Sequence, residues 1–277
     1  MHKGNILITG ASTGIGHACA LRFADLGFHV FAGVRQPAAR EALKAHPSGN
    51  LEPVFLDVTS AKSIAAALTI VSARPLAGLV NNAGIATAGP LELVPIDAWR
   101  RQFEINVIGL VAVTQACLPA LRLGRGRIVN VGSIADRCAL PCCGPYDSSK
   151  FAVSAITDVL RMEVRPWGIS VSLIEAGAIA TPIWDKSQRE ADELSQQVEP
   201  ERYALYRNLI ETERKETAEA ARTASPVAVV VKAVEHAMTA RRPRTRYLVG
   251  RDTWLWRILS WLPDRWRDRL ILSKVHE

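Results

Sequence analysis

The sequence predicts an α/β fold, with one doubly wound parallel sheet and helices on both of its faces. Short apolar runs alternate along the chain with longer helical patterns, which is typical of β-α-β units. The first apolar run ends in a glycine-rich turn, and a helical pattern follows at once. Several other apolar runs end in polar residues or glycine. In such sheets ligands bind beyond the carboxyl ends of the strands, so these segments are candidates for a site.

The first predicted strand, 5–9, runs into the turn GASTGIG at 10–16, and a helical pattern covers 17–26. Glycines allow a tight turn and a close approach of the backbone to a ligand, and the amides of a helix N-terminus bind pyrophosphate. The spacing G-x-x-x-G-x-G therefore favours a dinucleotide site. An ordinary glycine turn is the alternative.

The second predicted strand, 28–35, ends in Val34 and Arg35. NAD-binding sites usually place an acid there for the ribose 2′-hydroxyl. Here no carboxylate repels a 2′-phosphate, and Arg35 can pair with one through its planar guanidinium. This favours NADP(H) over NAD(H), unless Arg35 only ends a solvated loop.

Five further apolar runs predict strands at 51–57, 76–80, 126–132, 169–174 and 246–250. Helical patterns separate them at 61–73, 96–123, 145–165 and 226–240. We expect Asp97 to cap the long helix 96–123. Parallel strands bring their carboxyl ends to one edge of a sheet, so the residues after them should converge with the glycine turn. These residues are Asp57, 81–84, Ser133 and 177–181.

Tyr146 and Lys150 lie four residues apart in the predicted helix 145–165, so their side chains share one face. A free tyrosine titrates near ~10. An ammonium about 4 Å away, at an effective dielectric constant of about 20, favours the phenolate by up to ~4 kcal/mol. This predicts that the pKa of Tyr146 is lowered by ~2–3 units. Such a phenol can exchange a proton with a carbinol hydroxyl, although an exposed helix can carry the same pair.

The five cysteines are odd in number and show no C-x-x-C spacing, so neither a disulfide framework nor a metal site is expected. We interpret the adjacent Cys142 and Cys143 as small apolar pocket residues rather than a redox-sensitive pair. A reducing, cytoplasmic compartment is expected, because no signal peptide precedes the first strand and no uninterrupted apolar run spans a membrane. The net charge of +7 favours an anionic partner: a phosphorylated cofactor, an anionic membrane or nucleic acid. No nucleic-acid-binding fold accompanies it, so nucleic acid is not expected.

Together these motifs resemble the short-chain dehydrogenase/reductase family over roughly residues 4–250. The resembling segments are TGxxxGIG at 9–16, Asp57-Val58, NNAG at 81–84, NVxG at 106–109, Ser133, YxxxK at 146–150 and GxxxT at 177–181. The resemblance implies a single-domain Rossmann fold. It also implies reversible hydride transfer between C4 of a nicotinamide and a carbonyl or secondary-alcohol carbon.

The resemblance assigns roles to individual residues. Tyr146 is the acid/base, and Lys150 lowers its pKa and holds the nicotinamide ribose. Ser133 hydrogen-bonds the substrate oxygen, and Asn106 anchors a water in the proton relay. The implied cofactor-binding residues are Gly10, Ser12, Thr13, Gly14, Ile15, Gly16, Arg35, Asp57, Val58, Asn81, Asn82, Ala83, Gly84, Tyr146, Lys150, Gly177, Ile179 and Thr181. One departure is Ala176-Gly177, where the family commonly has Pro-Gly, and we expect it to affect cofactor affinity modestly.

The segments VFAGVR at 30–35 and ATPIW at 180–184 resemble the hydroxysteroid and retinol dehydrogenase branch. This implies an apolar, steroid- or retinoid-like alcohol or ketone as substrate, and a homodimer or homotetramer. Two alternatives remain: a non-catalytic dinucleotide-binding or scaffolding protein on the same fold, and a reductase of small polar keto compounds.

We expect one dinucleotide-binding and catalytic domain at 1–250, in which 182–225 is a substrate-covering insertion. Trp184, Tyr203, Tyr206 and Leu209 would form the apolar underside of this lid, unless the insertion is merely solvated. Amphipathic helices rich in Trp and Arg are expected at 251–277. They fit helices that pack on the pocket or on another subunit, which we favour, or interfacial helices in peripheral contact with a membrane.

Overall fold

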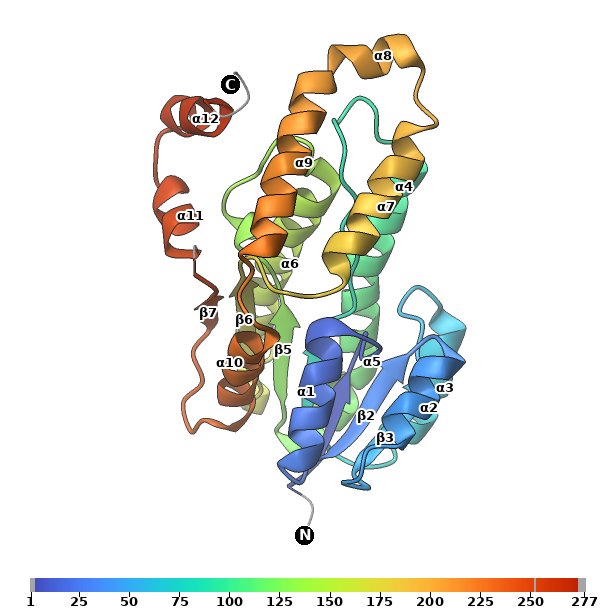
Figure 1. Cartoon of the computed structure of the whole chain (residues 1–277). Helices are drawn as coiled ribbons and strands as arrows, with labels where there is room; N and C mark the ends of the chain where they lie inside the picture. Colours follow the sequence, from blue (N-terminus) through green and yellow to red (C-terminus); the bar gives the residue numbers. More distant parts are fainter. Residues whose placement is uncertain (1–2, 252, 274–277) are drawn as a thin grey trace.

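The structure is a computed structural model that describes residues 3–251 and 253–273 (Figure 1). Within these residues a seven-stranded sheet has the order β3-β2-β1-β4-β5-β6-β7, and every neighbouring pair is parallel. The strands are β1 (Asn5–Ile8), β2 (His29–Val34), β3 (Leu51–Phe55), β4 (Leu76–Asn81), β5 (Arg127–Val131), β6 (Ser170–Ala176) and β7 (Arg246–Val249). The predicted doubly wound parallel sheet is confirmed, and its strand order reverses between β1 and β4.

Helices cover both faces of this sheet. One face carries α1 (Gly14–Asp25), α2 (Pro37–Lys44) and α10 (Val227–Thr239). The other carries α3 (Ala61–Val71), α5 (Gly109–Gly124) and α6 (Gly144–Glu163). Successive residues of β1 therefore enter different cores: Ile6 and Ile8 pack under α1, and Leu7 packs under α3 and α5. Burial on both faces explains why the strands are continuous apolar runs.

The helix expected at 96–123 has three parts: α4 (Ile96–Phe103), a π-helical turn (Glu104–Ile108) and α5. The prediction that Asp97 caps it is wrong. Pro95 holds the cap position, where its missing N–H costs nothing, and Asp97 pairs with Arg100 at 2.8 Å within the first turn. π-helical turns are rare and frequently lie at functional sites, and this one carries Asn106.

By length and composition this continuous helix, 96–124, is apolar enough to cross a membrane. The expectation from the sequence concerned only uninterrupted apolar runs, and polar residues such as Gln115 interrupt this one. In the structure the apolar face of α5, including Val113, Cys117 and Leu121, packs into the sheet core.

Two features on the α1 side were not predicted. The first is α2, which begins with Pro37 at its first position. The second is the start of α1 at Gly14, because the last residues of the glycine turn already form the first helical turn. The helix N-terminus consequently lies inside the motif that was expected to bind pyrophosphate.

The insertion forms α7 (Ile183–Ser195), α8 (Pro200–Leu205) and α9 (Arg207–Arg222), which stand beyond the carboxyl ends of the strands (Figure 1). The last helices among the described residues are α11 (Thr253–Leu259) and α12 (Asp264–Leu272), at the β7 side of the molecule. Residues 1–2, Asp252 and residues 274–277, which belong to the expected segments 1–250 and 251–277, lie outside the described residues.

Candidate active site

The glycine turn between β1 and α1 needs its glycines. Gly10 and Gly14 have φ values of +65° and +60°, a region that residues with a side chain rarely adopt. A Cβ on Gly16 would lie 2.3 Å from Asn82 Nδ2 and 2.5 Å from the Gly10 carbonyl oxygen. The turn is therefore packed directly against the segment that follows β4.

Hydrogen bonds hold these two segments together. Asn82 Nδ2 donates to the carbonyl oxygens of Thr9 and Gly10, both at 3.0 Å. The hydroxyl oxygen of Thr9 accepts from the amides of Asn82 and Ala83, also at 3.0 Å. The structure thus brings together the predicted groups 10–16 and 82–84.

Asn81 has a different place. Its side chain is buried, and Nδ2 donates to Thr114 Oγ1 and Asn130 Oδ1, both at 2.9 Å. These bonds brace β4 against α5 and β5 inside the core. The Asn81 side chain therefore stabilises the core, and its amide group does not take part in the contacts with the glycine turn.

The N-terminus of α1 suits an anion. Thr13 holds the cap position without a side-chain cap bond, and the first turn contains no acid. Lys186 Nζ lies 3.5 Å from Thr13 Oγ1, which places a cation beside the positive end of the helix dipole. Sequence reasoning missed Lys186, because it lies in the charged insertion and only the fold brings it to the turn.

The loop after β6 reaches the same place. A Cβ on Gly14 would lie 3.3 Å from Thr181 Cβ. Backbone bonds anchor the loop, from the Gly177 amide to the Val249 carbonyl at 2.8 Å and between Ala180 and Ser225 at 2.9 Å. Ile179 is buried, and its carbonyl accepts from Trp184 Nε1 at 2.8 Å.

Arg35 and Asp57 lie at the ends of neighbouring strands. The amide and hydroxyl of Thr59 donate to Asp57 Oδ1 at 3.0 and 2.8 Å. These bonds, together with the charge of Arg35, lower the pKa of Asp57 against the effect of its partial burial. Arg35 is exposed, and Val58 is buried against Gly109. A cation and a carboxylate therefore lie at the carboxyl ends of the neighbouring strands β2 and β3.

Tyr146, Lys150 and Ser133 converge as predicted. Lys150 Nζ lies 5.5 Å from the centroid of the Tyr146 ring and donates to the Val131 carbonyl at 3.1 Å. Ser133 caps a 3₁₀ turn (Ile134–Asp136), in which its Oγ accepts from the Ala135 amide at 3.2 Å, and it hydrogen-bonds with Tyr146. A phenol, a hydroxyl and an ammonium thus meet at the carboxyl end of β5.

The predicted lowering of the Tyr146 pKa is wrong in this structure. Burial raises the pKa of Tyr146 to about 12, and the hydrogen bond with Ser133 opposes this only in part. Burial also lowers the pKa of Lys150 to about 8. The sequence argument counted the charge of Lys150 but not the cost of desolvating a phenolate.

Asn106 fixes the chain beyond β4. Its Nδ2 donates to the Ile85 carbonyl at 3.0 Å, and its Oδ1 accepts from the Ile85 amide at 2.9 Å. Gln102, one turn earlier, donates to the same carbonyl at 2.9 Å. Both side chains also donate to Ser149 Oγ, which donates in turn to the Tyr146 carbonyl at 2.6 Å. Sequence reasoning missed Gln102 and Ser149, because only their partners distinguish them from ordinary helical residues.

A buried charge cluster behind the site was also missed. The side chains of Asp136 and Glu175 are fully buried. Arg137 and Arg246 each lie 2.7 Å from Glu175 but 3.9 and 3.7 Å from Asp136. Burial and the charge of Glu175 raise the pKa of Asp136 to about 7. The charge of Asp136 in turn opposes the lowering of the Lys150 pKa by burial and contributes to raising the pKa of Tyr146.

The cysteines before Tyr146 behave as apolar residues. Burial raises the pKa of Cys142 to about 12 and that of Cys143 well above its ordinary value. Thiols held in the protonated form are poor nucleophiles, which supports the interpretation as pocket residues. The Cys142 carbonyl accepts from the Gly89 amide at 2.7 Å and so joins this segment to the one after β4.

The insertion packs on the segment after β4. Glu190 accepts from Thr87 Oγ1 at 2.8 Å and pairs with Arg101 at 3.0 Å, and Tyr206 donates to Glu92 at 2.7 Å. Of the four side chains expected under the lid, Tyr203 lines a small cavity of about 20 Å³ there. Ile210, rather than the neighbouring Leu209, is the buried apolar residue.

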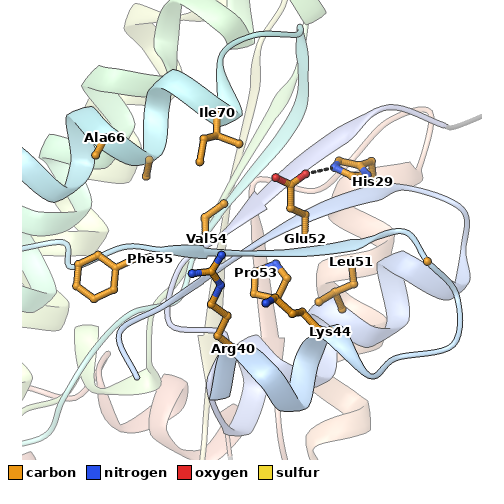
Figure 2. A pocket seen from close by; sticks show the side chains of 12 residues that line it. His29, Arg40, Lys44, Leu51, Glu52, Pro53, Val54, Phe55, Ala66 and Ile70 are labelled. Carbon is orange, nitrogen blue, oxygen red and sulfur yellow. Dashed lines mark hydrogen bonds and ion pairs between the residues drawn. The ribbon is translucent and has the colours of Figure 1, made fainter. Parts of the chain in front are cut away.

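A larger hollow of about 490 Å³ lies elsewhere, along the free edge of β3 between α2 and α3 (Figure 2). Val54, Phe55 and Ile70 line it together with Arg40 and Lys44, and Glu52 bonds to His29 at 3.0 Å beside it. None of the predicted site residues lines this hollow. Among the described residues, no group of three or more His, Cys, Asp or Glu side chains could hold a metal ion.

Comparisons with known proteins agree with this geometry. The sequence profile of the short chain dehydrogenase family matches residues 4–192. The chain is 37% identical over 258 residues to the 3-amino-tetrahydro-pyrrolizinone reductase of Xenorhabdus hominickii, which covers 91% of this chain and 88% of that protein. It is 36% identical over 284 residues to the 17-beta-hydroxysteroid dehydrogenase type 6 of Rattus norvegicus, with coverage of 98% and 88%. A short chain dehydrogenase of Burkholderia cenocepacia J2315, solved in complex with NADP, is 25% identical with a TM-score of 0.74, and 98% of each chain is covered.

Proposed function

The chain belongs to the short-chain dehydrogenase/reductase family and is an oxidoreductase acting on CH–OH groups, and from this premise we propose that it interconverts an apolar secondary alcohol and its ketone with NADP(H). The observation that carries the proposal is the meeting of Tyr146, Ser133 and Lys150 at the carboxyl end of β5. A non-catalytic dinucleotide-binding protein would have no physical need for this arrangement.

The residues around the glycine turn fit a dinucleotide. The turn admits no Cβ at Gly16, the N-terminus of α1 is free of acids, and Lys186 stands beside it. We assign the pyrophosphate to this helix N-terminus. Arg35 would hold a 2′-phosphate, and the loop of Thr181 would contact the nicotinamide end. When bound, the nicotinamide supplies or accepts the hydride.

The protein's own residues handle the proton. With a pKa of about 12, Tyr146 is protonated at neutral pH and is therefore suited to donate a proton to a ketone oxygen. Ser133 hydrogen-bonds the same oxygen as negative charge develops on it. Lys150, with a pKa of about 8, is mostly cationic at neutral pH and stabilises the phenolate that remains. This arrangement favours carbonyl reduction.

The substrate class is a finer proposal. The similarity to a 17-beta-hydroxysteroid dehydrogenase and the protonated thiols of Cys142 and Cys143 just before Tyr146 support an apolar, steroid- or retinoid-like ketone. The relative named as a reductase of a pyrrolizinone supports the second candidate, a reductase of small polar keto compounds.

The test is NADPH consumption by the purified protein with a panel of ketones, from steroids and retinal to small β-keto esters. A Tyr146→Phe sample is the control. Turnover of steroids or retinal that disappears in the variant is the expected result. Turnover of only small polar ketones would favour the second candidate, and tight NADPH binding without turnover of any ketone would favour a binding protein.

We also propose a homodimer or homotetramer that forms through α6. Phe151, Ala155, Val159 and Met162 form an exposed apolar stripe at helical spacing on this helix. Light scattering of the wild type and of Val159→Glu would test this, because a charge in the stripe should dissociate the assembly. The five free thiols fit a reducing compartment such as the cytoplasm.

A further inference from the structure

The two C-terminal helices expose an unusual concentration of large apolar side chains. Of the eighteen such side chains that are exposed in the described part of the chain, seven lie on or between α11 and α12. We call these seven, together with the arginines of the same segment, the C-terminal surface. They are Trp254, Leu255, Ile258, Trp261, Trp266, Leu270 and Leu272.

Their spacing makes these side chains neighbours. Trp254 and Ile258 are four residues apart on α11, as are Trp266 and Leu270 on α12. Trp254, Trp261 and Trp266 remain 58%, 70% and 69% exposed. Within 253–273 only Thr253 is buried, where it contacts Gly177. The rest of the described chain therefore leaves this surface uncovered, although the sequence analysis favoured helices that pack on the pocket or on another subunit.

The charge of the C-terminal surface is positive. Among its described residues, this segment has two acids, Asp264 and Asp268, and five arginines: Arg251, Arg257, Arg265, Arg267 and Arg269. Arg267 forms ion pairs with Asp264 at 2.8 Å and with Asp268 at 4.0 Å. The guanidinium of Arg257 lies 5.6 Å from the centroid of the Trp261 ring. The remaining arginines are exposed and form no ion pair among residues 3–251 and 253–273.

This combination selects one kind of partner. A second copy would present the same arginines across a two-fold axis, where like charges repel. Tryptophan prefers the boundary between hydrocarbon and water, and arginine beside it attracts anionic headgroups. We propose that the C-terminal surface docks the protein on an anionic lipid surface.

The docking site adjoins the candidate active site, because α11 contacts the 3₁₀ turn Ile134–Asp136 that Ser133 caps. Docking would therefore hold the substrate side close to the lipid. This consequence, unlike the docking itself, rests on the proposed apolar substrate.

Vesicle sedimentation of the full chain tests the proposal without an activity assay. We expect binding to an equal mixture of phosphatidylcholine and phosphatidylglycerol, weak binding to phosphatidylcholine alone, and release as the salt concentration rises. Combined Trp254→Ala, Trp261→Ala and Trp266→Ala should lower the partition coefficient by about tenfold or more. The matched control is Trp167→Ala, since Trp167 is 45% exposed but lies against Arg122 on another surface.

A second pair of variants tests the charge. Arg265→Gln with Arg269→Gln should remove the preference for anionic vesicles, whereas Lys62→Gln with Arg74→Gln, which changes the net charge equally, should retain it. Circular dichroism checks that each variant is folded. Equal binding to both vesicle types, full binding by the tryptophan variant, or an oligomer that only the tryptophan variant loses would overturn the proposal.

Discussion

Replacing Asp136 by asparagine should stabilise the protein at alkaline pH. Burial and Glu175 raise the pKa of Asp136 from 3.8 to about 7, so the folded state disfavours its charge. Arg137 and Arg246 do not cancel this cost, because their short contacts go to Glu175. Asparagine has the same shape and carries no charge, so it removes the cost.

The magnitude follows from the pKa difference. Each unit corresponds to about 1.4 kcal/mol. A group whose pKa is higher in the folded state contributes stability below its unfolded pKa and loses it as the pH rises through the folded pKa. The loss therefore develops between about pH 4 and pH 7, and above pH 7 it amounts to roughly 4 kcal/mol.

Urea denaturation of the wild type and Asp136→Asn at pH 5.5 and pH 8 measures this loss. The stability advantage of the variant should grow by about 2 kcal/mol between these two pH values. Asp158→Asn is the control with the opposite sign: hydrogen bonds from Arg161 and Arg246 outweigh the burial of Asp158 and lower its pKa, so its loss should destabilise the protein at pH 8. If Asp136→Asn were as destabilising at pH 8 as at pH 5.5, Asp136 would be an ordinary paired carboxylate and the reasoning would fail.

Three further predictions concern cofactor binding and activity. Gly16→Ala should raise the Kd of NADPH by about 30-fold or more, because the new methyl displaces Asn82 from two hydrogen bonds of about 1 kcal/mol each. Fluorescence titration measures this Kd, and an unchanged value would show that the turn does not bind the cofactor. Arg35→Ala should lower kcat/KM by about tenfold or more with NADPH but little with NADH, and an equal loss with both would remove the assignment of the 2′-phosphate. In Asp136→Asn the high-pH limb of ketone reduction should move to lower pH, because the charge that contributes to raising the pKa of Tyr146 is gone, whereas rates at low pH, where Asp136 is already neutral, should match the wild type.

Local patterns in the sequence were sufficient to predict the sheet and the residues at its carboxyl edge. The strands are apolar on both faces, and Tyr146 and Lys150 lie one helical turn apart, so both signals are contained in short segments. The buried cluster was not predictable in this way. Arg246 meets Glu175 only because the register pairs Leu173 with Arg246, and no local spacing encodes that register.

The error in the Tyr146 pKa has the same origin. The sequence shows a neighbouring lysine but not how much water surrounds the phenol, and here burial is the largest cause of the raised pKa of Tyr146. Gln102 illustrates the limit at the site. Nothing in its residue type or spacing distinguishes it from an exposed helical glutamine, yet its amide holds the chain at Ile85 and Thr87.

The unreactive cysteines have a practical consequence. Four of the five thiols are buried, and the pKa of the fifth, Cys143, is well above its ordinary value. Maleimides attack the thiolate, so the native chain should resist them near neutral pH. A single cysteine introduced at an exposed position of α12 would then take a fluorophore selectively, in the otherwise unaltered protein. The chain is thus suited to site-specific labelling, and such a probe would report how deeply this helix enters a bilayer.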